Sequence, residues 1–189
     1  MLTFNPETHE YKWNGVIKPS ATQVLSRVAV RENEDAHWHS VSGAEFAADK
    51  VAEHFGKESH AVFSNQLNKI DCTYDNALIP WVQGFAFFMA EHDMEIKLVE
   101  QPMYSEMYGF CGTPDLVCIY KGKFCIIDWK TSTQNQKHWA YQTAAYAQLV
   151  RELYRIRANE KILRMSVRIY ENYYDKTEYT KSSDWFCFL

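Results

Sequence analysis

The sequence predicts an α/β fold in which helices flank a central mixed β-sheet, with an N-terminal β-hairpin and a helical region before the sheet. Three observations predict it: apolar residues recur at helical spacing before residue 94, the period changes to two from Ile96, and a helix-type segment then returns. The 189 residues, 47% of them hydrophobic, are enough for one core. We therefore expect one domain, with residues 1–94 as hairpin and helical region and residues 95–189 as sheet, helix and terminal strands.

The first half of the chain predicts a hairpin followed by helices. The stretch "LTFNPETHEYKWNG" alternates apolar and polar residues around a turn. Ser20 is placed to cap the next helix, because its hydroxyl can accept from the amide of Gln23. One or two helices are expected over residues 35–67, with Gly43 and Gly56 as possible breaks, and another over residues 75–93, with Pro80 in or near its first turn.

The second half predicts strands around one helix. Residues 96–105, 114–120 and 124–132 alternate as strands, and Gly122 between the last two can take the positive φ of a tight turn. The segment "QKHWAYQTAAYAQLVRELYRIR" is rich in helix-forming residues. Two terminal β segments are expected at residues 164–172 and 177–188.

Composition excludes several classes of protein. No apolar run approaches the ~20 residues that a membrane helix needs, and the N-terminus lacks a signal peptide, so we expect a cytoplasmic protein with no membrane partner. The five cysteines form no CxxC pair and are odd in number, which argues against a disulfide framework or a clustered zinc site. The net charge of −4 gives no global sign of nucleic-acid binding.

Two acids stand in the strand segment "CGTPDLVCIYKGKFCIIDWKTST". If the strands pair about Gly122, Asp115 lies opposite Asp128 with Cβ atoms ~5 Å apart, and like charges at that distance repel. A shared proton, a fixed cationic side chain or a metal ion must neutralise them. Lys130 lies two residues beyond Asp128 and therefore on the same face of the strand.

Two interpretations of these residues remain open at this point. In one, Asp128 and Lys130 form an ion pair at the sheet end, while Asp115 caps the turn suggested by Thr113 and Pro114. In the other, the two carboxylates hold a divalent cation and Lys130 orients or deprotonates a water on it, which is a device for hydrolysing phosphodiesters.

The order "GTPD", twelve residues, then "DWK" resembles the signature of the PD-(D/E)XK nuclease superfamily. Within it the chain is most similar to the RecB-like exonuclease branch, which includes the mitochondrial genome maintenance exonuclease and phage exonucleases. Further matching stretches are "GKESH" with His60, Glu100 ahead of Asp115, "DWKTS", and "YQTAAYA" with Gln142 and Tyr146. The resemblance implies a restriction-endonuclease-like core and a Mg²⁺ or Mn²⁺ cofactor.

The resemblance also implies roles for individual residues. His60, Asp115, Asp128 and the carbonyl of Trp129 would hold the metal, although His60 alone would pass for an ordinary helix-face histidine. Asp115, Asp128, Lys130 and Glu100 would form the catalytic set; Glu100 binds the ion, a water or a second metal, or it holds Lys130. Residues expected to contact DNA are Gln142, Tyr146, Thr131, Ser132, Lys137 and Trp139. Tyr146 and Trp139 fit core aromatics equally well.

These roles together predict a metal-dependent deoxyribonuclease. The resemblance implies an exonuclease that acts on single strands or DNA ends in phage or bacterial DNA replication, recombination or degradation. The alternative is a non-catalytic DNA-binding or regulatory protein on the same fold. An iron–sulfur nuclease is discounted, because Cys72 and Cys187 cannot supply the four cysteines that such a cluster needs.

Overall fold

The computed structural model describes residues 1–32, 43–132 and 136–189, with side chains described outside residues 27–53. Its elements follow the chain in this order: β1 (Leu2–Asn5), β2 (Glu10–Trp13), β3 (Val16–Lys18), α1 (Ala21–Glu32), α2 (Gly43–Leu67), the short 3-10 helix η1 (Asn76–Leu78), α3 (Ile79–Glu91), β4 (Met94–Val99), β5 (Met103–Tyr104), β6 (Cys111–Gly112), β7 (Leu116–Tyr120), β8 (Lys123–Lys130), α4 (His138–Leu153), β9 (Leu163–Tyr170), β10 (Tyr173–Glu178) and α5 (Ser183–Phe188).

The central sheet has five strands in the order β10-β9-β8-β7-β4. Strands β8 and β9 pair in parallel, and the other neighbours pair antiparallel. A parallel pair needs a crossover connection, which α4 supplies between β8 and β9. The mixed sheet between helices, with a hairpin before it, confirms the predicted fold class.

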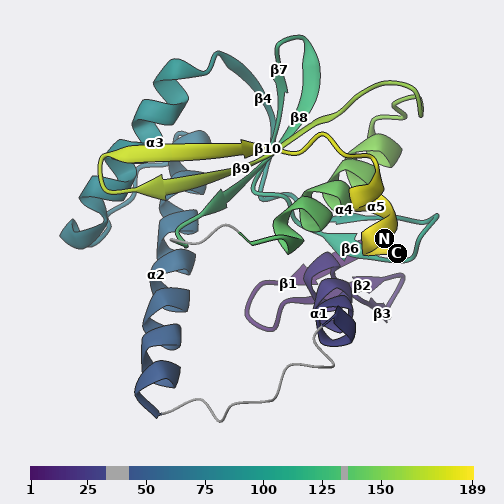
Figure 1. Ribbon diagram of the computed structural model, residues 1–189, viewed down its shortest axis with the longest axis horizontal. Coiled ribbons are helices and arrows are strands. Elements are labelled where there is room, and N and C mark those ends of the chain that lie inside the picture. Colours follow the sequence, from purple (N-terminus) through teal and green to yellow (C-terminus); the bar gives the residue numbers. More distant parts are fainter. Residues whose placement is uncertain (33–42, 133–135) are drawn as a thin grey trace.

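Helices cover both faces of this sheet (Figure 1). On one face, α2 and α3 bury Phe63, Phe85 and Phe88 against Trp129 of β8. On the other face, α4 packs with α1 and α5 over Ile126 and its neighbours. Successive residues of a strand point to opposite faces, so Trp129 enters the first core while Asp128 and Lys130 face α4.

The N-terminal hairpin is confirmed, and the structure extends it. A third strand, β3, pairs with β2 in the residues between the predicted hairpin and the first predicted helix. Helix α1 begins directly after Ser20, whose Oγ accepts from the amide of Gln23 at 3.1 Å, while Gln23 Oε1 accepts from the Ser20 amide at 3.0 Å. This reciprocal pair is a capping box, which satisfies two amides at the helix start.

The two predicted central helical regions are present. Helix α2 runs through Gly56 without a break, whereas Val41 and the other residues of 35–42 in the predicted segment lie outside the described residues. Helix α3 has Pro80 in its first turn, as the sequence predicts, where the missing N–H of proline costs nothing.

Two strand predictions are wrong in part. The predicted strand 96–105 divides, because β4 ends at Val99 before Pro102, and β5 then pairs with β6 in a separate two-stranded sheet. The segment 177–188 was expected to be β, but β10 ends at Glu178 and residues 183–188 form α5. Trp185 and Phe188 pack on the same core beside Phe110. Their spacing of three residues places both on one face of a helix.

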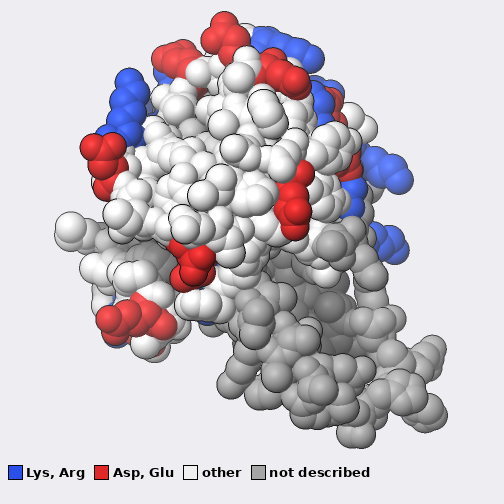
Figure 2. Space-filling view, turned by 90° about the vertical axis from the view of Figure 1, so that its left-hand side faces the viewer, with Lys and Arg blue, Asp and Glu red and all other residues white. Residues whose placement is uncertain are grey.

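Charged side chains are mixed rather than separated on the face shown in Figure 2, where acidic and basic residues lie close together around its edges. Among the described residues of this face, no large basic patch marks a surface for nucleic acid. Within the described part of the chain, no helix combines the length and the apolar character needed to span a bilayer.

Candidate active site

Three carboxylates meet near one end of the central sheet, where β4 ends, β7 begins and β8 approaches its last residue, Lys130. Val99 pairs with Leu116, and Leu116 pairs with Ile127. The next residue along each strand is acidic, so Glu100 lies beside Asp115, and Asp115 lies beside Asp128. The sequence predicts the second pair from the turn at Gly122. The first pair adds a third negative charge to the same place.

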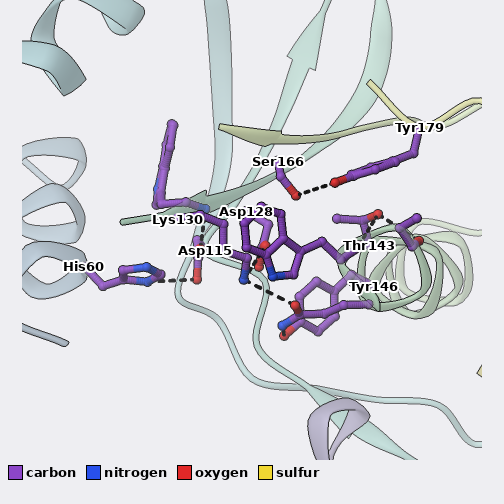
Figure 3. A network of polar contacts seen from close by, with 12 residues as sticks. His60, Asp115, Asp128, Lys130, Thr143, Tyr146, Ser166 and Tyr179 are labelled. Atoms are coloured by element: carbon purple, nitrogen blue, oxygen red, sulfur yellow. Dashed lines mark hydrogen bonds and ion pairs between the residues drawn. The ribbon is translucent and has the colours of Figure 1, made fainter. Parts of the chain in front are cut away.

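Asp115 is the central acid, and it is held on both oxygens. Its Oδ2 accepts from the backbone N–H of Trp129 at 2.7 Å, and its Oδ1 lies 3.4 Å from Nδ1 of His60. Figure 3 shows His60 reaching Asp115 from α2. Burial alone would raise the pKa of Asp115, but His60 and Lys130 lower it below its ordinary value. Asp115 is therefore a carboxylate at neutral pH.

The carbonyl of Trp129 points to the same side as its amide. In an extended strand, the N–H and C=O of one residue face the same neighbouring strand. Because the Trp129 amide bonds to Asp115, its carbonyl also faces the Asp115 side of β8. The Trp129 side chain is 1% exposed and lies in the aromatic core below, which fixes this part of the strand.

His60, Glu100 and Asp115 form a cluster that fits a divalent cation. One donor atom from each of them lies within 4.8 Å of the others. Two carboxylates and an imidazole are suitable ligands for Mn²⁺ or Mg²⁺. Burial would lower the pKa of His60, but Asp115 raises it to about 9, so in the metal-free protein the imidazole carries a proton that a metal would displace.

Glu100 belongs to this cluster rather than to an ion pair with Lys130. Burial and the nearby Asp115 raise the pKa of Glu100 to about 7. Its backbone has φ of +48°, a left-handed conformation that costs a non-glycine residue about 1–2 kcal/mol. The Glu100 amide donates to the carbonyl of Asp115 at 3.1 Å, which holds this turn against the start of β7.

Asp128 is paired with Lys130, whose Nζ lies 2.6 Å from Asp128 Oδ2. Burial raises the pKa of Asp128 to about 6, even though Lys130 acts to lower it. Burial would lower the pKa of Lys130, but Asp128 and Asp115 raise it above its ordinary value. Lys130 is thus an ammonium at neutral pH, able to donate to a water or to a phosphate oxygen.

A second layer of contacts from α4 holds Lys130. Gln142 accepts from Lys130 Nζ at 3.3 Å through Oε1 and donates from Nε2 to the hydroxyl of Tyr146 at 2.9 Å. The ammonium also lies 5.5 Å from the ring centroid of Trp139. Tyr146 packs over Gly112, where a Cβ would come within 2.8 Å of its ring. The geometry of Lys130 is therefore set by side chains of α4.

Some of the residues predicted to contact DNA lie at the candidate site, and others lie away from it. Thr131 and Ser132 are half-buried and directly follow Lys130, and Gly56 of α2 lies close to Thr131. Lys137 is exposed at the start of α4 and lines a separate cavity beside Lys181. Trp139 is only 3% exposed beneath Lys130, so its ring packs as a core aromatic in this structure. Its expected contact with DNA stays a prediction.

One wall of the site was not predicted. A cavity of about 680 Å³ contains His60, Glu100 and Asp115, and its opposite side is formed by Phe4 and Tyr11 of the N-terminal hairpin. The Tyr11 hydroxyl lies 2.7 Å from Oγ1 of Thr113 in the loop that carries Asp115. This contact joins residues far apart in the chain, so the sequence does not predict it. The signal that could have indicated the hairpin side of the cavity is the aromatic pair Phe4 and Tyr11 in the predicted hairpin.

Comparison with known proteins agrees with this geometry. A family model described as the PD-(D/E)XK nuclease superfamily matches residues 20–182, which is most of the chain. No curated protein gives a significant match. The matched range includes every carboxylate of the site as well as His60 and Lys130. The chain therefore belongs to the PD-(D/E)XK nuclease superfamily, whose members are generally metal-dependent nucleases.

Proposed function

We propose that the protein is a Mg²⁺- or Mn²⁺-dependent deoxyribonuclease, and that it acts as an exonuclease on single strands or DNA ends. One observation carries the proposal: Glu100, Asp115 and Asp128 lie side by side on three neighbouring strands near one end of the sheet, with His60 beside Asp115 and Lys130 beside Asp128. His60 and Lys130 offset part of this negative charge, and the raised pKa of Glu100 indicates that the cluster still lacks counter-charge, which a divalent cation would supply.

His60, Glu100 and Asp115 are the ligands that the geometry favours, and we assign Asp128 and the Trp129 carbonyl to the same centre. A divalent cation bound there would supply an activated water and would offset the negative charge that develops on the phosphate. Lys130 donates from its ammonium to that water or to a phosphate oxygen. Gln142 holds the ammonium in place, and Tyr146 holds Gln142.

Thr131 and Ser132 are proposed to contact the DNA backbone, since both immediately follow Lys130. Lys137 is proposed to contact a phosphate farther along the strand, because it is exposed at the start of the helix that carries Gln142. The branch-level resemblance supports the exonuclease activity, and with it a setting in phage or bacterial DNA replication, recombination or degradation. All described elements are proposed to form one nuclease domain.

Incubation with labelled DNA tests the activity. The wild-type protein should degrade DNA with Mg²⁺ or Mn²⁺, and Lys130→Ala should reduce the rate by about 10²-fold or more, since positioned proton-donating groups contribute roughly that amount. Lys123→Ala is the matched control, because Lys123 is exposed at the other end of the same strand and should retain full activity. Equal rates for Lys130→Ala and wild type would refute the mechanism.

Substrate topology tests the exonuclease part separately. Linear single strands labelled at the 5′ or the 3′ end should be shortened from an end, and covalently closed single-stranded circles should resist. Cleavage of the circles would show an endonuclease instead. A protein that binds Mn²⁺ and DNA but leaves every substrate intact would be the non-catalytic alternative.

A further inference from the structure

The N-terminal hairpin forms a wall of the cavity that holds the metal-ligand cluster. We call this space the hairpin cavity; its hairpin side is lined by Phe4, Pro6 and Tyr11, and its α2 side by Lys57, Ser64 and Asn65. In Figure 1 the loop between β1 and β2 extends towards α2. His60 and Asp115 line the same cavity, so a ligand that fills it lies beside the proposed metal ligands.

The hairpin wall is aromatic and firmly attached. Phe4 and Tyr11 are register partners on β1 and β2, and their ring centroids lie 4.5 Å apart. Tyr11 is buried, and its hydroxyl contacts Thr113, two residues before Asp115. At the other end of this N-terminal region, the amide of Cys111 donates to the carbonyl of Pro19 at 2.8 Å. Phe4 is thereby held at a fixed position relative to the acidic cluster.

The opposite wall has a different chemistry. Lys57 brings a positive charge, while Ser64 and Asn65 bring a hydroxyl and an amide, all from the face of α2 that also carries His60. An aromatic wall facing a wall of donors and acceptors suits a ligand with a flat apolar face, a hydrogen-bonding edge and a negative charge. A nucleotide has all three.

The size and position of the cavity favour an unpaired nucleotide. Its volume of about 680 Å³ lies within the range of roughly 300–1,000 Å³ that small-molecule sites occupy. In a duplex the faces of a base are covered by its neighbours and its edge is paired, so an enzyme that must surround a single base acts on a single strand or extrudes the nucleotide. Phe4 lines the same cavity as His60 and Asp115, so a base next to a phosphate held through a cation at these ligands would meet Phe4.

We propose that the hairpin cavity receives the unpaired nucleotide next to the phosphate to be cut, with its base packed against the ring of Phe4. This inference rests on the proposed function and makes it more specific, since it assigns the selection of unpaired DNA to the N-terminal hairpin. Phe4 is a specificity residue here, because it touches the substrate and none of the reacting atoms.

Binding measurements test the inference apart from cleavage. Fluorescently labelled oligothymidylate is titrated with protein in a Lys130→Ala background, which prevents hydrolysis, in a buffer containing Ca²⁺. Phe4→Leu should weaken binding by at least about fivefold, since stacking of one base on an aromatic ring contributes about 1–3 kcal/mol. Phe4→Tyr keeps a ring and should restore the affinity. Phe87→Leu is the matched control, because Phe87 is 52% exposed on α3 and lies away from the cavity.

A set of oligothymidylates with one abasic site at successive positions identifies the contact itself. In the Phe4 parent, one position should weaken binding by the same factor as Phe4→Leu does, and in Phe4→Leu that position should make no further difference. Equal affinities for the Phe4 parent and Phe4→Leu would overturn the inference. So would a loss in Phe4→Leu that is the same at every abasic position, since that pattern reports a purely structural role, or a parent that binds no oligothymidylate.

The two proposals fail in different ways. A wild-type protein that degrades DNA while Phe4→Leu binds normally would keep the proposed nuclease and remove the hairpin contact. A protein that cleaves nothing but shows the Phe4-dependent abasic pattern would keep the hairpin contact and remove the hydrolysis. Thermal unfolding of Phe4→Leu, measured beside Phe87→Leu, checks that both variants are folded.

Discussion

At the scale of single residues, the negative charges of the site are incompletely neutralised in the metal-free protein. Burial and mutual repulsion raise the pKa of Glu100 to about 7 and that of Asp128 to about 6, while Asp115 stays ionised beside His60. The position of Asp115 opposite Asp128 was predictable, because the turn at Gly122 sets the register locally. The approach of Glu100 and His60 was not derivable in the same way, since it depends on how α2 and β4 pack in three dimensions.

Glu100→Gln should stabilise the metal-free protein at high pH. A carboxyl group with a raised pKa contributes stability that is present below its unfolded pKa of 4.5 and is lost as pH rises through about 7. The variant removes this loss, so its melting temperature should exceed that of the wild type by about 2–4 °C at pH 8, for roughly 1 kcal/mol, and should match it near pH 4. Thermal unfolding in EDTA across this range measures the effect. A constant difference at all pH values would contradict it.

Metal binding should release protons. At pH 7 His60 carries a proton, with a pKa of about 9, and Glu100 is about half protonated. Both must lose these protons to ligate a cation, so Mn²⁺ affinity should rise between pH 6 and pH 8. Calorimetric titrations in two buffers of different ionisation enthalpy count the protons. A heat of binding that is the same in both buffers would show that these groups are not ligands.

At the scale of the elements, periodicity predicted most of the structure, and the exceptions have local causes. The long helices and the strand that ends in Asp128 and Lys130 follow strong patterns. Helix α5 has six residues, "SDWFCF", which are too few to distinguish the two-residue period of a strand from the period of a helix. The buried ion pair of Asp184 with Arg164, at 2.8 Å, favours the helix. Pro102 divides the predicted strand 96–105, because proline lacks the amide that a continuing ladder needs.

Gly84 permits the close packing of α3 on the hairpin between β9 and β10. A Cβ at this position would lie 2.5 Å from the carbonyl oxygen of Tyr173 and 2.6 Å from that of Tyr170, and backbone atoms cannot easily move aside. Gly84→Ala should therefore destabilise the protein by about 1–3 kcal/mol. Chemical denaturation measures this change.

Gly56→Ala is the matched control for that prediction. Gly56 lies inside α2, and an added Cβ would come no closer than 3.4 Å to Oγ1 of Thr131, which is an ordinary contact. Alanine is preferred to glycine in a helix by up to about 1 kcal/mol, so this variant should be neutral or more stable. Similar losses for both glycines would show that helix packing does not explain the effect at Gly84.

At the scale of the whole molecule, two helical layers and the N-terminal hairpin meet at one end of the sheet. Helix α2 brings His60 from one face, α4 brings Gln142 from the other, and the strands bring the acids between them. The order of these elements was predictable from the sequence, but the meeting of hairpin and acidic cluster was not. No local pattern encodes a contact between Tyr11 and Thr113.

A cation shared by α2, β4 and β7 should stabilise the entire fold. Binding to the native state at a concentration about 100 times the dissociation constant adds about 2.7 kcal/mol. Mn²⁺ should thus raise the melting temperature of the wild type and of Lys123→Ala equally, and Asp115→Asn should show little or no rise. Differential scanning calorimetry provides the measurement. An undiminished rise in Asp115→Asn would place the ion elsewhere.

The contact between Tyr11 and Thr113 also has a consequence for biosynthesis. It joins residues 102 positions apart. On the ribosome, the opening hairpin leaves the exit tunnel long before its partner loop exists, and contacts between such distant positions form slowly. The acidic cluster is therefore completed late, because a chain that ends before Thr113 also lacks Asp115, Asp128 and Lys130 and cannot assemble the candidate site.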